Sequence, residues 1–393
     1  MTTMYELAQQ DYRQPKDVPE LRRYLQAALE VEHLTIPVYL TGMYSIKPGT
    51  NAYAYGVIRS VLLEEMLHMT LAANLLTAVG GKADVSKFVR KYPARLPFAD
   101  KRVPEVRLRH YSPEALVTFL DIERPQSFVP PNGQKPTGWT SIGQFYDAIR
   151  RGVTDLEQAA REQEPPSTIF TGVAGDQIGP RDFYNSGGEV FAVTGLKTAL
   201  LAIEVISDQG EGAHDTIWDS DDKIFGEERQ VAHYFRFNEI HKGRRYGRHD
   251  LPRTSPSGPL LDITWADAYP IDPMAKIEDY RDSPELKTQA VLFNKTYAKL
   301  IAVLEKTFHG RSDLMHHVVP LMVELRDASQ RLYRNPHPNA AKAALGLHAS
   351  PTFELTDLFL AEGRTYADEL VARTEEPSQL RGGGVLPSWT RPH

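Results

Sequence analysis

Two long helical patterns near the beginning of the chain each carry a glutamate within their apolar stripe. In the first pattern, residues 20–45, apolar side chains recur at three- and four-residue spacing and Glu32 falls among them. In the second pattern, residues 51–79, Glu65 and His68 share the apolar stripe. The two patterns predict a mainly α-helical fold in which carboxylates point into the core.

Glutamate at such a position is energetically demanding. An ionised carboxylate in an apolar core costs several kcal/mol unless a cation or a hydrogen-bond donor compensates it. Glu32 therefore stands out, whereas Glu30 is expected on the opposite face of the same helix. Taken alone, Glu32 is explained by a buried ion pair or hydrogen bond as well as by a metal.

The second helix favours the metal. Glu65-Met66-Leu67-His68 places a carboxylate and an imidazole side by side on one helical face. Two inward-facing glutamates repel each other, and a cation between them resolves the conflict. We therefore expect Glu32, Glu65 and His68 to bind a metal together. Glu64, turned about 100° from Glu65, is expected to matter much less.

Composition excludes several function classes. The chain has 393 residues, no cysteine and a net charge of −6 from 45 basic and 51 acidic residues. Without cysteine, disulfides and thiolate ligands are excluded, so a metal must be held by nitrogen and oxygen. The mixed charges argue against a nucleic-acid partner. The absence of an apolar signal core or membrane-spanning stretch predicts a cytoplasmic protein with no membrane association.

The remaining sequence suggests one large helical domain. A proline-rich insertion, about 82–188, separates the first helical pair from a second pair at about 189–208 and 227–241. Two hairpins joined by a long crossover predict a four-helix bundle, and the insertion is long enough to roof a substrate pocket. Further helices are expected at about 141–163, 284–308 and 314–333. We expect the domain to cover residues 18–335, with a C-terminal extension at 336–393.

The first helical pair resembles the corresponding hairpin of ferritins and their relatives. The resemblance is carried by Glu32 with Tyr39, then by Glu64-Glu65-Met66-Leu67-His68 and Gly80-Gly81. It is closer still to the ferritin-like domain named after iminophenyl-pyruvate dimer synthase, which occurs in bacterial enzymes that oxidatively couple amino-acid-derived imines. Further resembling stretches are residues 29–40, Gln209-Gly210-Glu211-Gly212 and His233-Tyr234-Phe235-Arg236-Phe237. The resemblance implies a ferritin-like bundle with ligand positions at Glu32, Glu65 and His68.

The second half of the metal site is less regular. Glu204 and His233 lie on apolar stripes of the third and fourth helices, so both are expected to point inward. A regular half-site has glutamate three residues before His233, but this position is Gln230, a neutral ligand at best. Glu211, flanked by glycines, is an alternative ligand that a plain loop carboxylate explains equally well. Glu123 is expected to form a salt bridge. One metal, or two with unequal coordination, remains compatible with this set.

These features predict a non-haem iron oxidoreductase that uses O₂ or peroxide. Glutamate and histidine suit one or two iron ions, although another divalent metal is compatible. Tyr39 is expected to act beside the metal as a hydrogen-bond donor or redox partner. The resemblance implies a small amino-acid-derived or aromatic substrate from specialised metabolism, and it is compatible with a homo-oligomer. Two alternatives stay open: a non-catalytic metal-binding or iron-storage protein, and a metal-free polar network.

Overall fold

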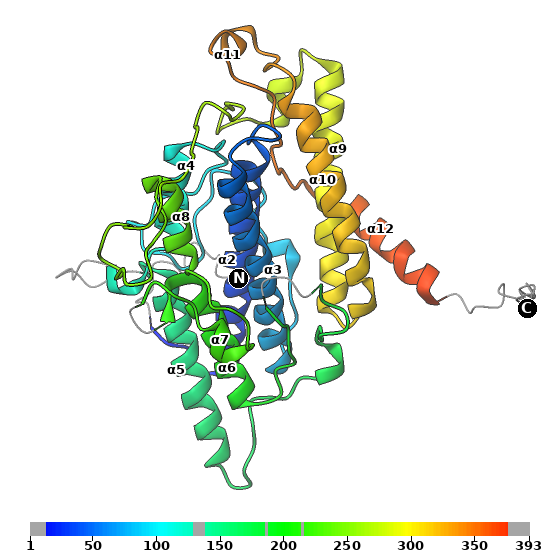
Figure 1. The fold of residues 1–393 in the computed structure, drawn as a ribbon. Coiled ribbons are helices and arrows are strands. Elements are labelled where there is room, and N and C mark those ends of the chain that lie inside the picture. The colour runs from blue at the N-terminus through cyan, green and yellow to red at the C-terminus, as the bar shows by residue number, and fades with distance from the viewer. Residues whose placement is uncertain (1–12, 129–137, 185–187, 214–215, 376–393) are drawn as a thin grey trace, which may run out of the picture.

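A central helical hairpin organises the structure, a computed structural model that describes residues 13–128, 138–184, 188–213 and 216–375. Helices α2 (Val18–Tyr44) and α3 (Ala52–Ala78) lie side by side at the centre of the molecule (Figure 1). The Asp17 side chain caps α2 by accepting a hydrogen bond from the Glu20 N–H. Just beyond α3, Gly80 adopts a positive φ of 71°, which glycine allows at little cost. This hairpin matches the first helical pair expected from the sequence.

Two columns of helices, each built from two segments, complete a bundle around the hairpin. Helix α4 (Pro113–Ile122) packs against α8 (His233–Lys242), and α5 (Ile142–Arg161) packs against α6 (Leu196–Glu211). In Figure 1, α4 and α8 lie above α5 and α6. One column consists of α4 and α5, which both contact α2. The other consists of α8 and α6, which both contact α3. The bundle therefore combines two continuous helices with two interrupted columns, which confirms the mainly helical fold.

The interrupted columns differ from the expected second hairpin. Residues 82–188, expected as an insertion, supply α4 and α5 of the bundle itself. The sequence does carry signals for α4, because Ser112 caps its first turn and Pro113 occupies its first position. Helices α6 and α8 begin at residues 196 and 233, several residues after the expected starts.

A further layer of helices covers the outer side of the hairpin. Helices α9 (Pro284–Phe308) and α10 (Val318–Tyr333) pack together, with α9 contacting α3 and α10 contacting α2. Helix α12 (Asp357–Glu375) packs along α9 at the edge of the molecule (Figure 1). Glu30, on the face of α2 opposite Glu32, is buried as well, with only 2% of its surface exposed.

The remaining described elements are short. They are α7 (Asp221–Ile224), α11 (Ala340–Ala344) and the 3₁₀ turns Val85–Lys87, Gln126–Phe128, Ala174–Asp176, Ile277–Tyr280 and Ser312–His317. The last of these turns occupies the beginning of the helix expected at 314–333. Within the described ranges no helix combines the length and apolar character needed to cross a membrane. Residues 376–393 of the expected C-terminal extension lie outside the described part.

Candidate metal centre

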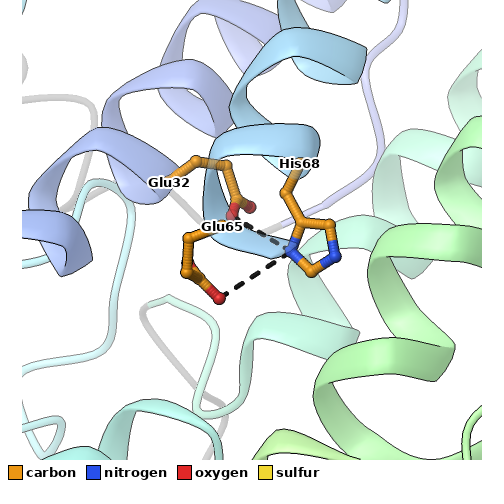
Figure 2. Close-up of side chains that lie close together, drawn as sticks. All are labelled: Glu32, Glu65 and His68. Atoms are coloured by element: carbon orange, nitrogen blue, oxygen red, sulfur yellow. Dashed lines mark ion pairs between the residues drawn. The ribbon is translucent and has the colours of Figure 1, made fainter. Parts of the chain in front are cut away.

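The hairpin brings together the three residues expected to share a metal. Figure 2 shows Glu32 of α2 pointing toward Glu65 and His68 of α3. The Nδ1 atom of His68 lies 3.6 Å from Glu32 Oε2 and 3.8 Å from Glu65 Oε1. These separations exceed a normal hydrogen bond. They suit ligands of one ion, because two atoms that each lie about 2.1 Å from a metal are roughly 3 to 4 Å apart.

A second group of potential ligands adjoins the first. Glu65, Glu123 and His233 place their ligand atoms within 4.8 Å of one another. The Nδ1 atom of His233 lies 3.1 Å from Glu65 Oε1 and 3.5 Å from Glu123 Oε2. The same Oε1 atom of Glu65 thus faces His68 on one side and His233 on the other. The geometry offers two adjoining positions that share one carboxylate.

The surroundings of His233 test whether a cation fits. Its Nδ1 atom is buried and makes no hydrogen bond, although two carboxylate oxygens are near. Burial opposes a positive charge, yet Glu123, Glu64 and Glu65 together raise the pKa of His233 well above its usual range. The field at this nitrogen therefore favours a cation. The nitrogen and oxygen donors match those used for iron, so the residues present fit a metal.

The second ring nitrogen of each histidine, Nε2, also has a side-chain partner that fixes the ring. His68 Nε2 lies 2.8 Å from the amide oxygen of Gln209, and His233 Nε2 lies 2.7 Å from Glu64. Glu64 also accepts a hydrogen bond from Arg236 at 2.6 Å. Such partners fix the ring so that Nδ1 faces the centre. Glu64, expected to matter much less than Glu65, thus has a structural part in the centre, because α8 places His233 and Arg236 against it.

The carboxylates share a common arrangement. In each, one oxygen accepts a hydrogen bond from a hydroxyl group and the other faces a histidine. The pairs are Tyr146 with Glu32, Tyr39 with Glu123, and Thr35 with Glu65. Burial and Glu123 raise the pKa of Tyr39 well above its usual value, so this hydroxyl keeps its proton. Burial, followed by repulsion from Glu123, raises the pKa of Glu65 to about 7. The centre is thus rich in negative charge.

Two of the expected donors point elsewhere. Glu204 is half-buried and belongs to neither ligand group of the described residues. It lies five residues from Gln209, or about 140° around α6, and Gln209 faces His68. Gln230 is exposed in the segment that precedes α8, so it does not lie one helical turn before His233. The expectation for Gln230 assumed a longer fourth helix than the chain forms, whereas Glu204 lies within α6 but on another face than Gln209.

Glu211 has a different surrounding from the one expected of a ligand. Its carboxylate accepts hydrogen bonds from the backbone N–H groups of Gln126 at 2.9 Å and Gly143 at 2.6 Å. Burial raises its pKa to about 7. The residue lines a cleft of about 520 Å³ at the point where α4 and α6 end and α8 begins. The cleft is formed by Pro125, Gln126, Ser127, Glu211, Gly212, Thr216, Phe235 and Pro252.

Glu123 is the ligand candidate that the sequence did not reveal. No lysine or arginine of the described residues pairs with it, and the neighbouring Arg124 binds Asp121 instead. The salt bridge expected of Glu123 is formed with His233 instead, whose Nδ1 lies 3.5 Å from Glu123 Oε2. Glu123 caps the end of α4, one turn after the buried Phe119. Recognition of α4 as a helix would have placed Glu123 on its apolar stripe.

Comparisons with known proteins place the chain among ferritin-like proteins. The family described as Ferritin-like matches residues 25–242. Dichlorochromopyrrolate synthase from Lentzea aerocolonigenes is 25% identical over 346 residues, which cover 78% of this chain and 30% of that protein. The crystal structure of a ferritin-like protein from Caulobacter vibrioides has a TM-score of 0.53 and 22% identity, covering 85% of this chain and 97% of that one. The structural likeness shows the fold alone.

Proposed function

Because the chain belongs to the ferritin-like family, we propose that it is a non-haem iron oxidoreductase acting on a small organic substrate. The observation that carries the proposal is the buried convergence of three carboxylates and two imidazoles on adjoining positions. These residues are Glu32, Glu65, Glu123, His68 and His233. Iron held by these residues would pass electrons from the substrate to O₂ or peroxide. Another divalent metal in place of iron is compatible with the same donors.

The chain's own residues would prepare the centre in two ways. Gln209 and Glu64 hold the two histidine rings, so their free nitrogens stay directed inward. Tyr39 holds a proton next to Glu123, and Tyr146 holds one next to Glu32. Burial, followed by the adjacent carboxylate, raises the pKa of each tyrosine. We propose that Tyr39 acts beside the metal as a hydrogen-bond donor or redox partner.

The polar cleft beside Glu211 is the proposed entrance for substrate. Its walls include Pro125 and Phe235, each two residues away from the site residues Glu123 and His233. A substrate in the cleft would approach the centre from the side on which α4 and α6 end and α8 begins. The relative named as a synthase of dichlorochromopyrrolate supports an amino-acid-derived or aromatic substrate in specialised metabolism. Because the chain spans only 30% of that protein, the product in its name is not assigned to this chain.

Metal stoichiometry and oxygen consumption test the proposal together. Metal-free protein is titrated anaerobically with Fe(II), and O₂ uptake is then followed with and without aromatic amino acids as probes. We expect at most two irons per chain, one for each ligand group, and O₂ uptake stimulated by a probe. The Glu65→Ala variant should lose both, whereas the control Glu204→Ala should retain both. Retention of hundreds of irons per assembly would instead favour storage, and no binding above the Glu65→Ala level would refute a metal centre.

A further inference from the structure

A second cavity lies between the hairpin and the layer formed by α9 and α10. Its volume is about 100 Å³, and its lining contains no aspartate, glutamate, lysine or arginine. Four methionines belong to this lining: Met66, Met69, Met315 and Met322. Methionine side chains are flexible and polarizable, so such walls adapt to the shape of an apolar occupant. Apolar cavities of about 150 Å³ are known to stay dry and to bind benzene.

The cavity is separate from the candidate metal centre. Met66 and Met69 directly follow Glu65 and His68 in α3, and Leu40 directly follows Tyr39 in α2. One residue along a helix corresponds to a rotation of about 100°. The row of residues that lines the cavity is therefore turned away from the row that forms the centre. An occupant of the cavity would lie behind the ligands rather than among them.

Among the polar side chains of the lining, His33 and Tyr297 form a pair. The hydroxyl of Tyr297 lies 2.6 Å from His33 Nε2, while His33 Nδ1 is buried without a partner. If Tyr297 donates to Nε2, the Nδ1 atom carries a hydrogen that no group accepts. If Nε2 donates instead, the Nδ1 lone pair and the tyrosine hydrogen are both left unsatisfied. In either tautomer the pair offers an unused hydrogen bond, which is costly in a buried position.

The cavity also approaches the surface of the protein. Val319 of α10 contributes to the lining and has 37% of its surface exposed. A small molecule therefore has a short path from solvent to the methionine-lined interior.

We propose that this cavity binds a small uncharged molecule with an apolar body and one hydroxyl group, which completes the hydrogen bonding of His33 and Tyr297. A hydroxyl both donates and accepts, so it satisfies either tautomer of His33. A charged ligand is disfavoured, because no charged side chain lines the cavity to compensate it. The proposal does not depend on the metal centre, since its test uses the full chain without metal.

Methionine methyl groups report on occupancy directly. Protein labelled with ¹³C at the methionine methyl groups is titrated with benzyl alcohol, and methyl resonances are followed by NMR. We expect saturable shifts for Met66, Met69, Met315 and Met322, with Met43 and Met274 unchanged as internal controls. Toluene, which lacks the hydroxyl, should bind about fivefold more weakly, the worth of one ordinary hydrogen bond. The His33→Phe variant should remove this difference.

Two cavity-filling variants guard against a folding artefact. Leu304→Trp and Met322→Phe each add volume to the lining and should abolish the shifts. Either variant is informative when its circular dichroism spectrum and thermal unfolding midpoint match those of the unmodified chain. Absence of saturable shifts in the unmodified protein would overturn the proposal. So would shifts of similar size at the control methionines, or equal binding of toluene and benzyl alcohol.

Discussion

Glu64 and Glu65 are adjacent in α3 but have opposite electrostatic surroundings. Burial opposes ionisation of Glu64, yet Arg236 and His233 outweigh it and lower the pKa of Glu64 to about 2. No arginine of the described part of the chain pairs with Glu65, and burial together with Glu123 raises its pKa to about 7. In a metal-free protein the negative charge of Glu64 is therefore compensated, whereas ionisation of Glu65 is unfavourable. A bound cation would compensate the charge of Glu65.

The first prediction compares Glu64→Gln with Glu65→Gln in metal-free protein at pH 8. Glu64→Gln should lower the free energy of unfolding by roughly 3 kcal/mol or more, because it leaves the buried Arg236 without its closest anion. Glu65→Gln should raise it by about 2 kcal/mol, because an unfavourable ionisation is removed. Urea denaturation in the presence of a chelator measures both changes. The electrostatic account fails if the two variants shift stability in the same direction.

The second prediction concerns Glu30, which accepts a hydrogen bond from Gln26 but has no ion-pair partner among the described residues. Burial raises its pKa from 4.5 to about 8. The folded state then binds more protons than the unfolded state between these values, so stability falls as pH rises through this window. Each pH unit should cost about 1.4 kcal/mol. Glu30→Gln should remove this loss, so its advantage over the unmodified chain grows from pH 5 to pH 8. An identical pH dependence of the two proteins, measured by urea denaturation, would contradict the prediction.

At the scale of helices, the chemistry gathers where elements begin and end. Glu123 follows the last residue of α4, and His233 is the first residue of α8. Gln209 lies in the last turn of α6, and Tyr146 in the second turn of α5. The continuous helices α2 and α3 supply the other half of the centre from their middle turns. One half of the centre is thus built on regular helix and the other on helix termini.

This difference explains what the sequence could predict. Along the 27 residues of α3, helical periodicity fixes the face of every side chain, so Glu65 and His68 were placed together correctly. The ten-residue helix α4 offers less than three turns of pattern, and Glu123 meets His233 only through tertiary packing. Gln230 was misplaced because helical periodicity was extended over residues that precede α8. Periodicity predicts faces within a helix but not which helix ends meet.

The third prediction uses two glutamines as a matched pair. Gln209→Met removes the hydrogen-bond partner of His68 Nε2 and should weaken metal binding 10- to 100-fold, the usual effect of losing such a partner. Gln230→Met changes an exposed side chain and should leave affinity unchanged. Gln230→Glu is also expected to leave metal affinity unchanged, although the sequence alone suggests that it would add a ligand. Calorimetric titration of metal-free protein with Co(II) measures all three. A stronger effect at Gln230 than at Gln209 would show that the assignment of the two residues is reversed.

At the scale of the whole molecule, the α2–α3 hairpin is the middle of a layered arrangement. One side of the hairpin faces the interrupted columns and carries the candidate metal centre, while the other faces α9 and α10 (Figure 1). His33 is buried on this second side, where its Nε2 contacts the hydroxyl of Tyr297 in α9, which a single-helix pattern could not indicate. The burial of α2 on both faces explains why its apolar stripe seemed narrower in the sequence than its interface in the structure.

The last prediction follows because a bound metal would contact some helices of the molecule and not others. Its ligands would come from α2, α3, α8 and the end of α4, and none from the outer helices. Helices as short as α4 and α8, ten residues each, are marginal without tertiary support. Metal at 100 times its dissociation constant adds about 2.7 kcal/mol to the stability of the folded state. We expect Co(II) to slow amide hydrogen exchange mainly at residues 113–122 and 233–242, with little change at α9, α10 and α12. In Glu65→Ala the same Co(II) concentration should give no protection. Equal protection of inner and outer helices would show that the cation binds somewhere other than between the hairpin and the interrupted columns, because only that position links the short helices to α2 and α3.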